Sequence, residues 1–385
     1  MMTIFWPEKI PAPVYETNYS YSFCWEATRD LTKCKLITYR PDSTIGELFG
    51  SAKPSQPFCV VCDPEVIISG FAIESMEKAV QKFGEMAGPL FNLSDYPSQV
   101  ALLPYPYVDR FTFIEVAEIL NKNKNEACIE TTVLDPAVVA FHPNAIKDIP
   151  LSYKLEKLVD IPASKIVCEG ALVHKFGDYY SAQREDLVDL VPRNVVTVLD
   201  IGCARGGYGQ MLKTKRPDIH ITGVELNPNL AKEAEKVYDI VIQQPLEEAE
   251  FDMKFDLINM GDVLEHLYDP WEMLAKTTSL LKPGGWLTGS VPNSGHWSIV
   301  KQLSMGTLEY IPVGLLCVSH IRFFTELSLK KCLTDSGYKI EYFECLKPAP
   351  TPTGQKFIEL LVNNGVGNQE SLLTTELVFR AKLKK

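Results

Sequence analysis

The chain has 385 residues, of which 46% are hydrophobic and 23% are charged. This is ordinary globular composition, and it excludes collagen, coiled coil and wholesale disorder. Subtracting 38 Lys and Arg from 49 Asp and Glu leaves a net charge of −11, so the surface has no general attraction for nucleic acids or anionic membranes. The length suffices for two domains that each bury a core.

No apolar run reaches the roughly 18–20 residues of a membrane span. The first 15 residues contain Trp6, Pro7 and Glu8 in place of the apolar core of a signal peptide. The ten cysteines are scattered through apolar stretches, which suits reduced thiols. We therefore expect a cytoplasmic protein with no nucleic-acid partner and no membrane insertion, and self-association is left open.

The first part of the chain alternates strand-like and helix-like segments and is rich in proline. The expected strands are 36–39, 58–62, 100–103, 128–134 and 138–141, and the expected helices are 75–83 and 114–121. Pro150 and Pro162 then flank a short helical stretch, which indicates a seam between domains. We expect a smaller α/β domain over 1–165 and a second domain over 166–385.

After the seam, strands and helices alternate regularly, which is typical of a doubly wound, mainly parallel sheet. The expected strands are 195–199, 219–224, 239–243, 256–260 and 286–291, with helices 181–191, 207–213, 229–237 and 270–281 between them. Two tail segments, 338–346 and 373–382, are expected to pair at one edge. The sequence therefore predicts an α/β fold with a seven-stranded sheet.

A glycine loop joins the first of these strands to its helix. Gly202, Ala204 and Gly206 lie where the strand ends and the helix begins, so the backbone can approach a ligand at the carboxyl edge of the sheet. Glu225 ends the next strand, 225 − 202 = 23 residues after Gly202, where a carboxylate can accept hydrogen bonds from both ribose hydroxyls. Together these features predict a ligand that contains adenosine.

The order of residues in the loop selects among adenosine cofactors. A nicotinamide site requires G-x-G-x-x-G, whereas this loop reads Gly202-x-Ala204-x-Gly206 with Asp200 just upstream. An acidic group that faces the loop would repel a diphosphate and attract an ammonium or a sulfonium, while the loop amides receive a carboxylate. We therefore expect S-adenosylmethionine.

The region from about residue 175 to 385 resembles the class I S-adenosylmethionine-dependent methyltransferases. The glycine loop resembles their first motif, Glu225 their ribose acid, 281–285 the turn before their fifth strand, and 261–266 their fourth-strand motif. Gln244 and Pro245 depart from the usual Gly-Asp, so we expect backbone and apolar contacts near Leu246 to bind the adenine. The cofactor-binding residues that the resemblance implies are Asp200, Gly202, Cys203, Ala204, Gly206, Glu225, Leu226, Leu246, Gly261 and Asp262.

Further motifs resemble methyltransferases of bacterial surface-polysaccharide synthesis: 179–180 with Arg184, 290–293 with His296, 314–316, and 320–325. The resemblance implies O-methylation of a sugar hydroxyl, on a surface glycan or a nucleotide-linked precursor. Cys317 stands where such proteins usually have an aspartate. In the first domain, Asp63 and Glu65 follow a strand in a way that resembles the acidic motif of a type-A glycosyltransferase, which implies a degenerate domain for acceptor binding or assembly. The alternative is an exposed turn over 63–65.

A sugar hydroxyl is a poor nucleophile, so we expect a nearby base, and a neutral histidine suits that task. The catalytic candidates are His296 and His320; packing or capping is the alternative for His320. Relatives that act on quinone precursors can bind a metal through E-x-x-E-H, which Asp262, Glu265 and His266 could imitate; capping is the alternative there, and no metal is expected. Segment 294–318 contains three glycines and is expected to form a mobile lid.

Two other functions stay open. One is a small-molecule methyltransferase for a quinone or phenol, which activity on phenols and a divalent-ion requirement would indicate. The other is a protein that binds the cofactor and acts in assembly without catalysis. The departures from the usual residues at Pro245 and Cys317 favour this alternative.

Overall fold

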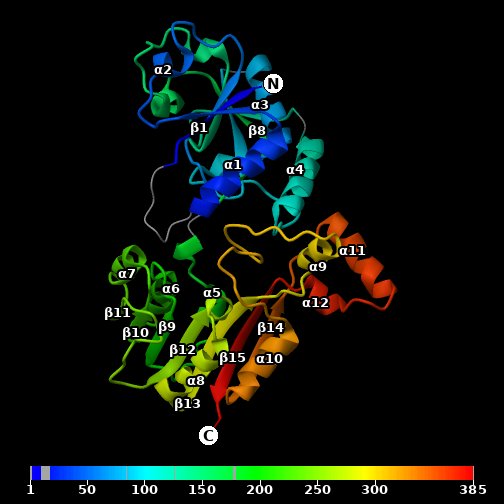
Figure 1. Cartoon of the computed structure of the whole chain (residues 1–385). Helices are drawn as coiled ribbons and strands as arrows, with labels where there is room; N and C mark the ends of the chain where they lie inside the picture. The colour runs from blue at the N-terminus through cyan, green and yellow to red at the C-terminus, as the bar shows by residue number, and fades with distance from the viewer. Residues whose placement is uncertain (1, 10–17, 84, 125, 177–178, 385) are drawn as a thin grey trace. The chain divides into compact units, whose positions relative to one another are not determined.

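The computed structural model describes residues 2–9, 18–83, 85–124, 126–176 and 179–384. The chain divides into two compact units, Met1–Gly177 and Asp178–Lys385 (Figure 1). This boundary lies 177 − 165 = 12 residues after the expected one. The difference arises because strand β8 (Lys165–Lys175) lies between two other strands of the first sheet and pairs with both, so it belongs to the first unit.

The first unit is built on a mixed eight-stranded sheet of order β2-β1-β3-β7-β5-β8-β4, with β6 paired to β8. Its other strands are β1 (Thr3–Pro7), β2 (Lys35–Tyr39), β3 (Phe58–Val61), β4 (Val66–Ile68), β5 (Met86–Phe91), β6 (Cys128–Thr131) and β7 (Val138–Phe141). Its helices are α1 (Asn18–Thr32), α2 (Ile45–Phe49), α3 (Gly70–Lys82) and α4 (Arg110–Lys124), with short 3₁₀ turns at Pro97–Gln99, Pro143–Ile146 and Leu155–Asp160. Strand side chains alternate between two cores: Ile4 and Trp6 of β1 lie in one, and Phe5 lies in the other.

One expected strand of this unit is wrong. Segment 100–103 makes a single bridge, between Val100 and Phe91, and the Leu102 side chain is 93% exposed. Ala101 and Leu103 still pack on the core of this unit, but without a run of strand pairing the segment is not a strand. The expected strand at 128–134 ends at Thr131, and β1, α1, β4 and β5 were not predicted.

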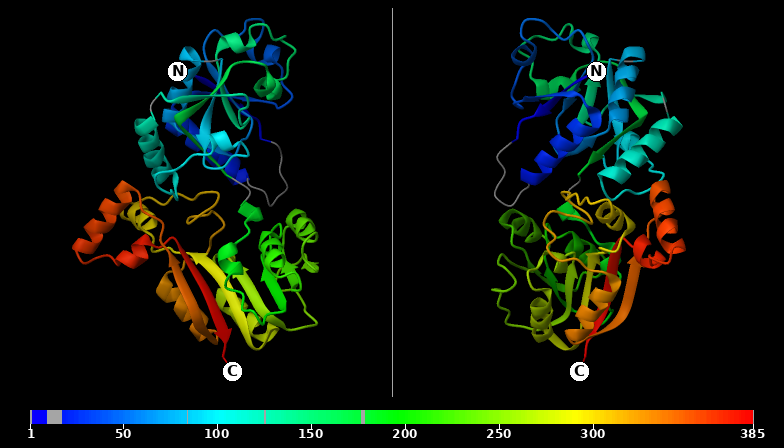
Figure 2. Two further views of the ribbon diagram at one scale, coloured as in Figure 1. Left: turned by 180° about the vertical axis from the view of Figure 1, so that it is seen from behind. Right: turned by 45° about the vertical axis from the view of Figure 1, so that its right-hand side comes forward.

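The second unit contains a seven-stranded sheet of order β11-β10-β9-β12-β13-β15-β14, which confirms the predicted fold class. The strands are β9 (Thr197–Ile201), β10 (His220–Val224), β11 (Ile240–Ile242), β12 (Phe255–Gly261), β13 (Leu281–Pro292), β14 (Tyr338–Leu346) and β15 (Glu376–Leu383). All neighbours are parallel except β15, which is antiparallel to both β13 and β14. Strands β14 and β15 lie side by side at one edge of the sheet (Figure 2), which is the pairing expected for the two tail segments.

Helices cover both faces of this sheet. They are α5 (Glu185–Val188), α6 (Gly207–Lys215), α7 (Pro228–Ala234), α8 (Pro270–Leu280) and α10 (Glu326–Asp335), with 3₁₀ turns at Tyr179–Ser181 and Leu264–His266. Side chains of α5, α6 and α7 share one core, and those of α8 and α10 share the other. The chain runs outward from β9 to β11 in one direction and from β12 to β13 in the other. The carboxyl ends of β9 and β12 therefore flank the crevice where ligands bind in such sheets.

Three helices that were not predicted as such form a small apolar cluster beyond β13: α9 (Trp297–Ser304), α11 (Pro352–Asn363) and α12 (Gln369–Leu373). Trp297, Ile358 and Leu372 are its buried centre. The first part of the segment expected to form a lid is thus a helix packed on α11, and the mobility of that segment stays a prediction.

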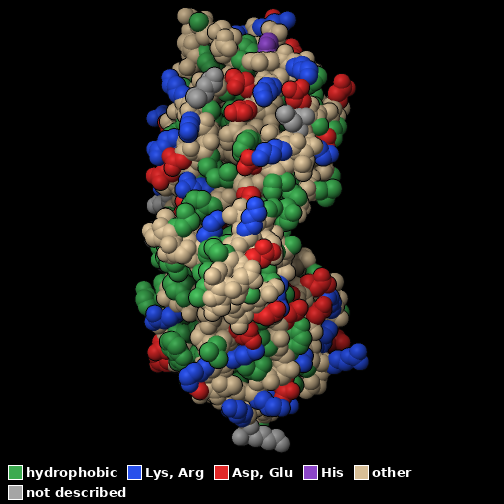
Figure 3. Space-filling view, turned by 90° about the vertical axis from the view of Figure 1, so that its right-hand side faces the viewer, with side chains coloured by type: hydrophobic (Ala, Val, Ile, Leu, Met, Phe, Trp, Pro, Cys, Tyr) green, Lys and Arg blue, Asp and Glu red, His purple; other side chains and the backbone are tan. Residues whose placement is uncertain are grey.

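No helix among the described residues is both long and apolar enough to cross a bilayer. Acidic, basic and hydrophobic side chains are interspersed on the face shown in Figure 3, so the net charge of −11 is not gathered into one patch there.

Candidate functional site

The glycine loop lies at the carboxyl end of β9, against the segment that follows β12. Gly202 has a φ of +71°, and a Cβ atom there would lie 2.9 Å from Cγ2 of Val263. Gly206 has a φ of +88° and lies against Tyr238 and Ala234. Both positions need glycine for conformation as well as for space. Ala204 also has a positive φ, of +48°, so the expected departure from glycine occupies a strained position.

The backbone amides of the loop are hydrogen-bonded within the chain. The N–H groups of Gly202 and Cys203 donate to the carbonyl of Val224, at 2.9 and 3.1 Å. Those of Arg205 and Gly206 donate to the carbonyls of Tyr180 and Cys203. The expectation that the loop amides stand free for a carboxylate is therefore not met in this structure. The Cys203 side chain is buried and turned toward Gly223, so only its backbone faces the loop.

Glu225 is joined to the loop directly. Its Oε2 accepts the N–H of Ala204 at 2.9 Å, and its Oε1 accepts the N–H of Asn227 at 2.8 Å. A carboxylate has about four acceptor positions, so both oxygens can still accept hydroxyl groups. Leu226, beside it, is 54% exposed at the rim of the crevice. This arrangement retains the capacity that the sequence predicted for Glu225.

Asp200 does not face the crevice, contrary to the sequence interpretation. Its side chain is 2% exposed, and its oxygens accept hydrogen bonds from the Tyr238 hydroxyl at 2.5 Å and from Asn259 Nδ2 at 2.7 Å. Burial raises the pKa of Asp200 to about 6, against these two hydrogen bonds, which lower it. Asp200 therefore braces the strand beneath the loop, and its charge is not presented to a ligand.

Three further residues predicted to bind the cofactor are Leu246, Gly261 and Asp262, and their binding roles stay predictions. Leu246 is 5% exposed, and its carbonyl accepts a hydrogen bond from Nζ of Lys276. Gly261 ends β12, and a Cβ there would lie 2.7 Å from Leu187. Asp262 has a φ of +54°, and its carboxylate pairs with Arg184 at 2.6 Å and accepts the Ser290 hydroxyl at 2.6 Å.

His296, the first catalytic candidate, caps helix α9. Its Nδ1 lies 3.3 Å from the N–H of Ser298 and 2.9 Å from the hydroxyl of the same residue, and the side chain is 3% exposed. Burial lowers the pKa of His296 to about 3, so the ring stays neutral at physiological pH. The capping role is clear from the structure, and the role as a base stays a prediction.

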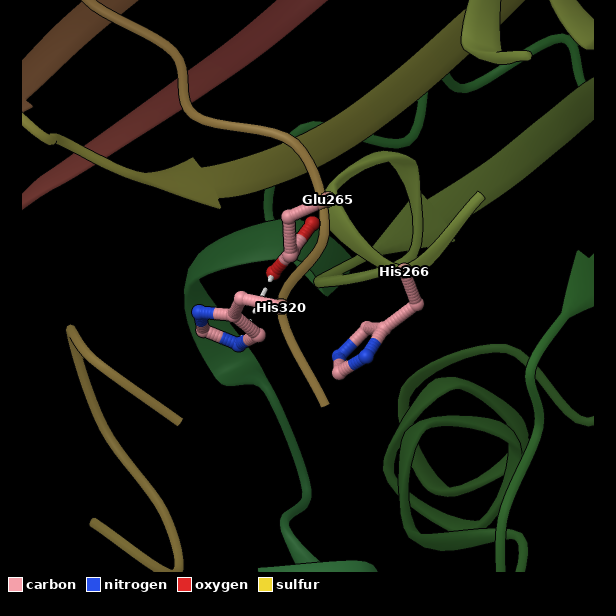
Figure 4. Close-up of side chains that lie close together, drawn as sticks. All are labelled: Glu265, His266 and His320. Carbon is pink, nitrogen blue, oxygen red and sulfur yellow. Dashed lines mark ion pairs between the residues drawn. The ribbon is translucent and has the colours of Figure 1, made fainter. Parts of the chain in front are cut away.

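His320, the second candidate, lies beside Glu265 and His266, which come from the turn after β12 (Figure 4). One ligand atom from each of the three residues lies within 4.8 Å of the others. Nε2 of His320 is 4.0 Å from Oε1 of Glu265, and the two imidazole rings meet edge to face with centroids 4.8 Å apart. We call these three residues the carboxylate–histidine cluster.

Glu265 is the least satisfied member of the cluster. Its side chain is 1% exposed, and neither carboxylate oxygen has a hydrogen-bond partner among the described residues. Burial and the charge of Asp262 raise its pKa well above the usual range. Burial also lowers the pKa of His320 to about 4 and that of His266. Two neutral imidazoles and an orphaned carboxyl group can bind a cation or a protonated donor.

Residues 171–342 match a protein family described as "Methyltransferase domain". The match begins within β8 and extends into β14, so it covers the glycine loop, Glu225 and the carboxylate–histidine cluster. It contains the five parallel strands β9 to β13, including the two whose carboxyl ends flank the crevice described above. The second unit is a class I S-adenosylmethionine-dependent methyltransferase domain.

The methyltransferase domain also has curated relatives. A mitochondrial ubiquinone biosynthesis O-methyltransferase of Candida albicans is 24% identical over 214 residues, which cover 52% of this chain and 64% of that protein. A ubiquinone biosynthesis O-methyltransferase of Xylella fastidiosa is 30% identical over 145 residues, which cover 31% of this chain and 55% of that protein. The matches thus span between about half and two thirds of these relatives.

Among solved structures, the N-methyltransferase NodS of Bradyrhizobium japonicum in complex with S-adenosyl-L-homocysteine is similar to 50% of this chain. That similarity covers 79% of NodS, at 16% identity and a TM-score of 0.33.

Two residues of the methyltransferase domain escaped the sequence interpretation. Tyr238 supports the glycine loop: its hydroxyl donates to Asp200 and accepts the N–H of Gly209 at 3.0 Å. Glu376, at the start of β15, pairs with Arg184 at 2.7 Å. Neither residue belongs to a local motif, and each is brought to the site by an element distant in sequence.

Proposed function

We propose that the methyltransferase domain transfers the methyl group of S-adenosylmethionine to a hydroxyl oxygen of a small-molecule acceptor. The observation that carries this proposal is the carboxylate–histidine cluster, which adjoins the segment packed on Gly202. Transfer is an in-line displacement at the sulfonium carbon, so it needs an acceptor oxygen held about 3–3.5 Å away and relieved of its proton. The neutral imidazoles of His266 and His320 can accept that proton.

The cluster also fits a divalent cation. Its donors are one carboxylate and two imidazoles, which suit a first-row transition metal ion, and the buried Glu265 carboxylate has no hydrogen-bond partner among the described residues. A cation bound there would lower the pKa of a coordinated acceptor hydroxyl.

A phenol or quinone-derived acceptor is the class we favour. Segments that carry the cluster also carry exposed aromatic side chains: Tyr268 is 85% exposed and Phe323 is 49% exposed. Aromatic faces bind a planar ring through stacking and apolar contact. Two curated relatives are named as ubiquinone biosynthesis O-methyltransferases, which agrees with this class.

A sugar hydroxyl is the second candidate, because the motifs around His296 and His320 resemble polysaccharide methyltransferases. In that case the first unit would bind the glycan. Asp63 follows β3 at the carboxyl edge of the first sheet, 3.8 Å from Nζ of Lys175, which also lies 3.7 Å from buried Asp135. The ammonium group of Lys175 already neutralises Asp63, which favours a non-catalytic role for this unit.

The test compares Glu265→Gln with wild type in an assay of homocysteine released from S-adenosyl-L-homocysteine. Panels of catechols, phenols and sugars are assayed with added Mn²⁺ or Zn²⁺ and after chelation. We expect turnover of phenols, a loss of about 100-fold or more in kcat for Glu265→Gln, and unchanged affinity for S-adenosylmethionine.

Glu272→Gln is the matched control, because Glu272 is an exposed glutamate on α8. It should keep full activity. Turnover of sugars alone would favour the second candidate. Full activity of Glu265→Gln on every acceptor would overturn the role given to the cluster.

A further inference from the structure

Besides the carboxylate–histidine cluster, the methyltransferase domain has a second group of charged side chains, which surrounds Asp262. The Arg184 guanidinium makes ion pairs with three carboxylates, those of Asp186 at 2.8 Å, Asp262 at 2.6 Å and Glu376 at 2.7 Å. It also donates to the Ser290 hydroxyl at 3.0 Å. We call Arg184 and its three carboxylates the arginine network.

The network links four parts of the fold that are far apart in sequence. Arg184 precedes α5, Asp262 follows β12, Ser290 lies on β13, and Glu376 begins β15. Arg184 and Asp262 both adopt left-handed backbone conformations, with φ of +47° and +54°. Strain of this kind in residues that are not glycine persists where surrounding contacts over-determine it, and it concentrates at functional sites.

The network is also next to the cofactor loop. Val263, which follows Asp262, is the residue that a Cβ at Gly202 would strike. A Cβ at Gly261 would lie 3.5 Å from Nη1 of Arg184. The network therefore faces the end of the crevice where the strand-four segment meets the glycine loop.

Its charges do not balance. One guanidinium pairs with three carboxylates, and the side chains of Arg184, Asp262 and Glu376 are only 19%, 20% and 29% exposed. Burial, and to a smaller extent the charge of Asp262, raise the pKa of Glu376 to about 7. Arg184 thus leaves an excess of negative charge in a region of reduced dielectric.

We infer that the arginine network makes the site prefer the sulfonium cofactor over its thioether product. This inference rests on the proposed function. S-adenosylmethionine carries a positive sulfur; transfer of its methyl group to an acceptor oxygen breaks the S–C bond, leaves the electron pair on a neutral sulfur, and releases the hydroxyl proton. The excess negative charge stabilises the positive sulfur and contributes little to the neutral one, so product is released more readily.

The test is calorimetric titration of the full chain with S-adenosylmethionine and with S-adenosyl-L-homocysteine at pH 8, where Glu376 is ionised. The quantity measured is the ratio of the two Kd values. Because one negative charge of the network is removed, Glu376→Gln should lower the preference for the sulfonium form by roughly several-fold. Loss of packing alone would weaken both ligands equally and leave the ratio unchanged.

Glu370→Gln is the control for net charge, because Glu370 lies on α12, outside the network, where it forms an ion pair with Lys347. It should leave the ratio as in wild type. Asp186→Asn removes a second carboxylate of the network and should shift the ratio in the same direction if Glu376→Gln fails to fold. A ratio unchanged in both network variants would overturn the inference, whereas binding of neither ligand by wild type would overturn the cofactor assignment itself.

Discussion

Replacing Tyr238 by phenylalanine isolates one hydroxyl beneath the glycine loop. That hydroxyl donates to buried Asp200 and accepts the N–H of Gly209. A hydrogen bond to a charged group contributes about 1.5–3 kcal/mol, and a buried N–H left without an acceptor costs about 1–3 kcal/mol. We therefore expect Tyr238→Phe to lower the free energy of unfolding of the second unit by about 3 kcal/mol at pH 7.5.

The loss in free energy of unfolding caused by Tyr238→Phe should be smaller at low pH. The pKa of Asp200 is raised to about 6 in the folded state, so this group favours folding at low pH and loses that contribution as pH rises through 6. The Tyr238 hydrogen bond lowers this pKa, so its removal penalises the charged form most. We expect the deficit to fall to about 1–2 kcal/mol at pH 5, where the carboxyl group is largely protonated.

Differential scanning calorimetry of the full chain measures both values, and stabilisation by S-adenosyl-L-homocysteine identifies the transition of the second unit. A deficit of about 3 kcal/mol corresponds to roughly 6–12 °C in Tm for a unit of this size. Tyr338→Phe is the matched control, because the Tyr338 hydroxyl is bonded to the neutral hydroxyl of Thr277 at 2.8 Å. Equal deficits for Tyr238→Phe at pH 5 and pH 7.5 would refute the reasoning.

Three further changes probe the same domain. Glu225→Ala should weaken S-adenosylmethionine binding by at least about tenfold in a calorimetric titration, because two ribose hydroxyls lose a charged acceptor; equal affinity would remove Glu225 from the site. Gly209→Ala should cost about 1–3 kcal/mol in thermal unfolding, since its Cβ would lie 2.4 Å from the Tyr238 ring. His296→Ala should lose about 1 kcal/mol of cap stability, which His296→Ser restores, and the loss should not vary from pH 5 to 9 because the pKa of His296 is held near 3. Activity in His296→Ser equal to wild type would leave the residue as a cap only.

Local patterns in the sequence were enough to predict the fold of the second unit and the edge of its sheet where the crevice lies. The spacing from Gly202 to Glu225 depends on one strand, one turn and one helix, and neighbours along the chain determine such units. The structure keeps Glu225 on the glycine loop, as this spacing implied. Val100 and Leu102 show the limit of such patterns, because apolar alternation alone does not establish that a strand has a partner.

The direction of charged side chains was decided by tertiary contacts. Asp200 lies near the end of a strand, and the sequence therefore suggested that its carboxylate faces the ligand. In the structure this carboxylate instead accepts hydrogen bonds from Tyr238 and Asn259. His320 joined Glu265 only because the segment after α9 returns to the turn after β12, where its backbone bonds to the Glu265 carbonyl.

The sequence by itself thus determined the class of fold, because the alternation of strands and helices depends on contacts between neighbours in the chain; the roles of the glycine loop and of Glu225 in binding the cofactor stay predictions. Only the tertiary structure decided the arginine network around Arg184 and Glu376, whose members are 192 residues apart. It also decided which acids form ion pairs, and that the Glu265 carboxyl group has no hydrogen-bond partner in the part of the chain that the structure describes. Burial and ion pairing depend on every element packed around a group and leave no local trace in the sequence.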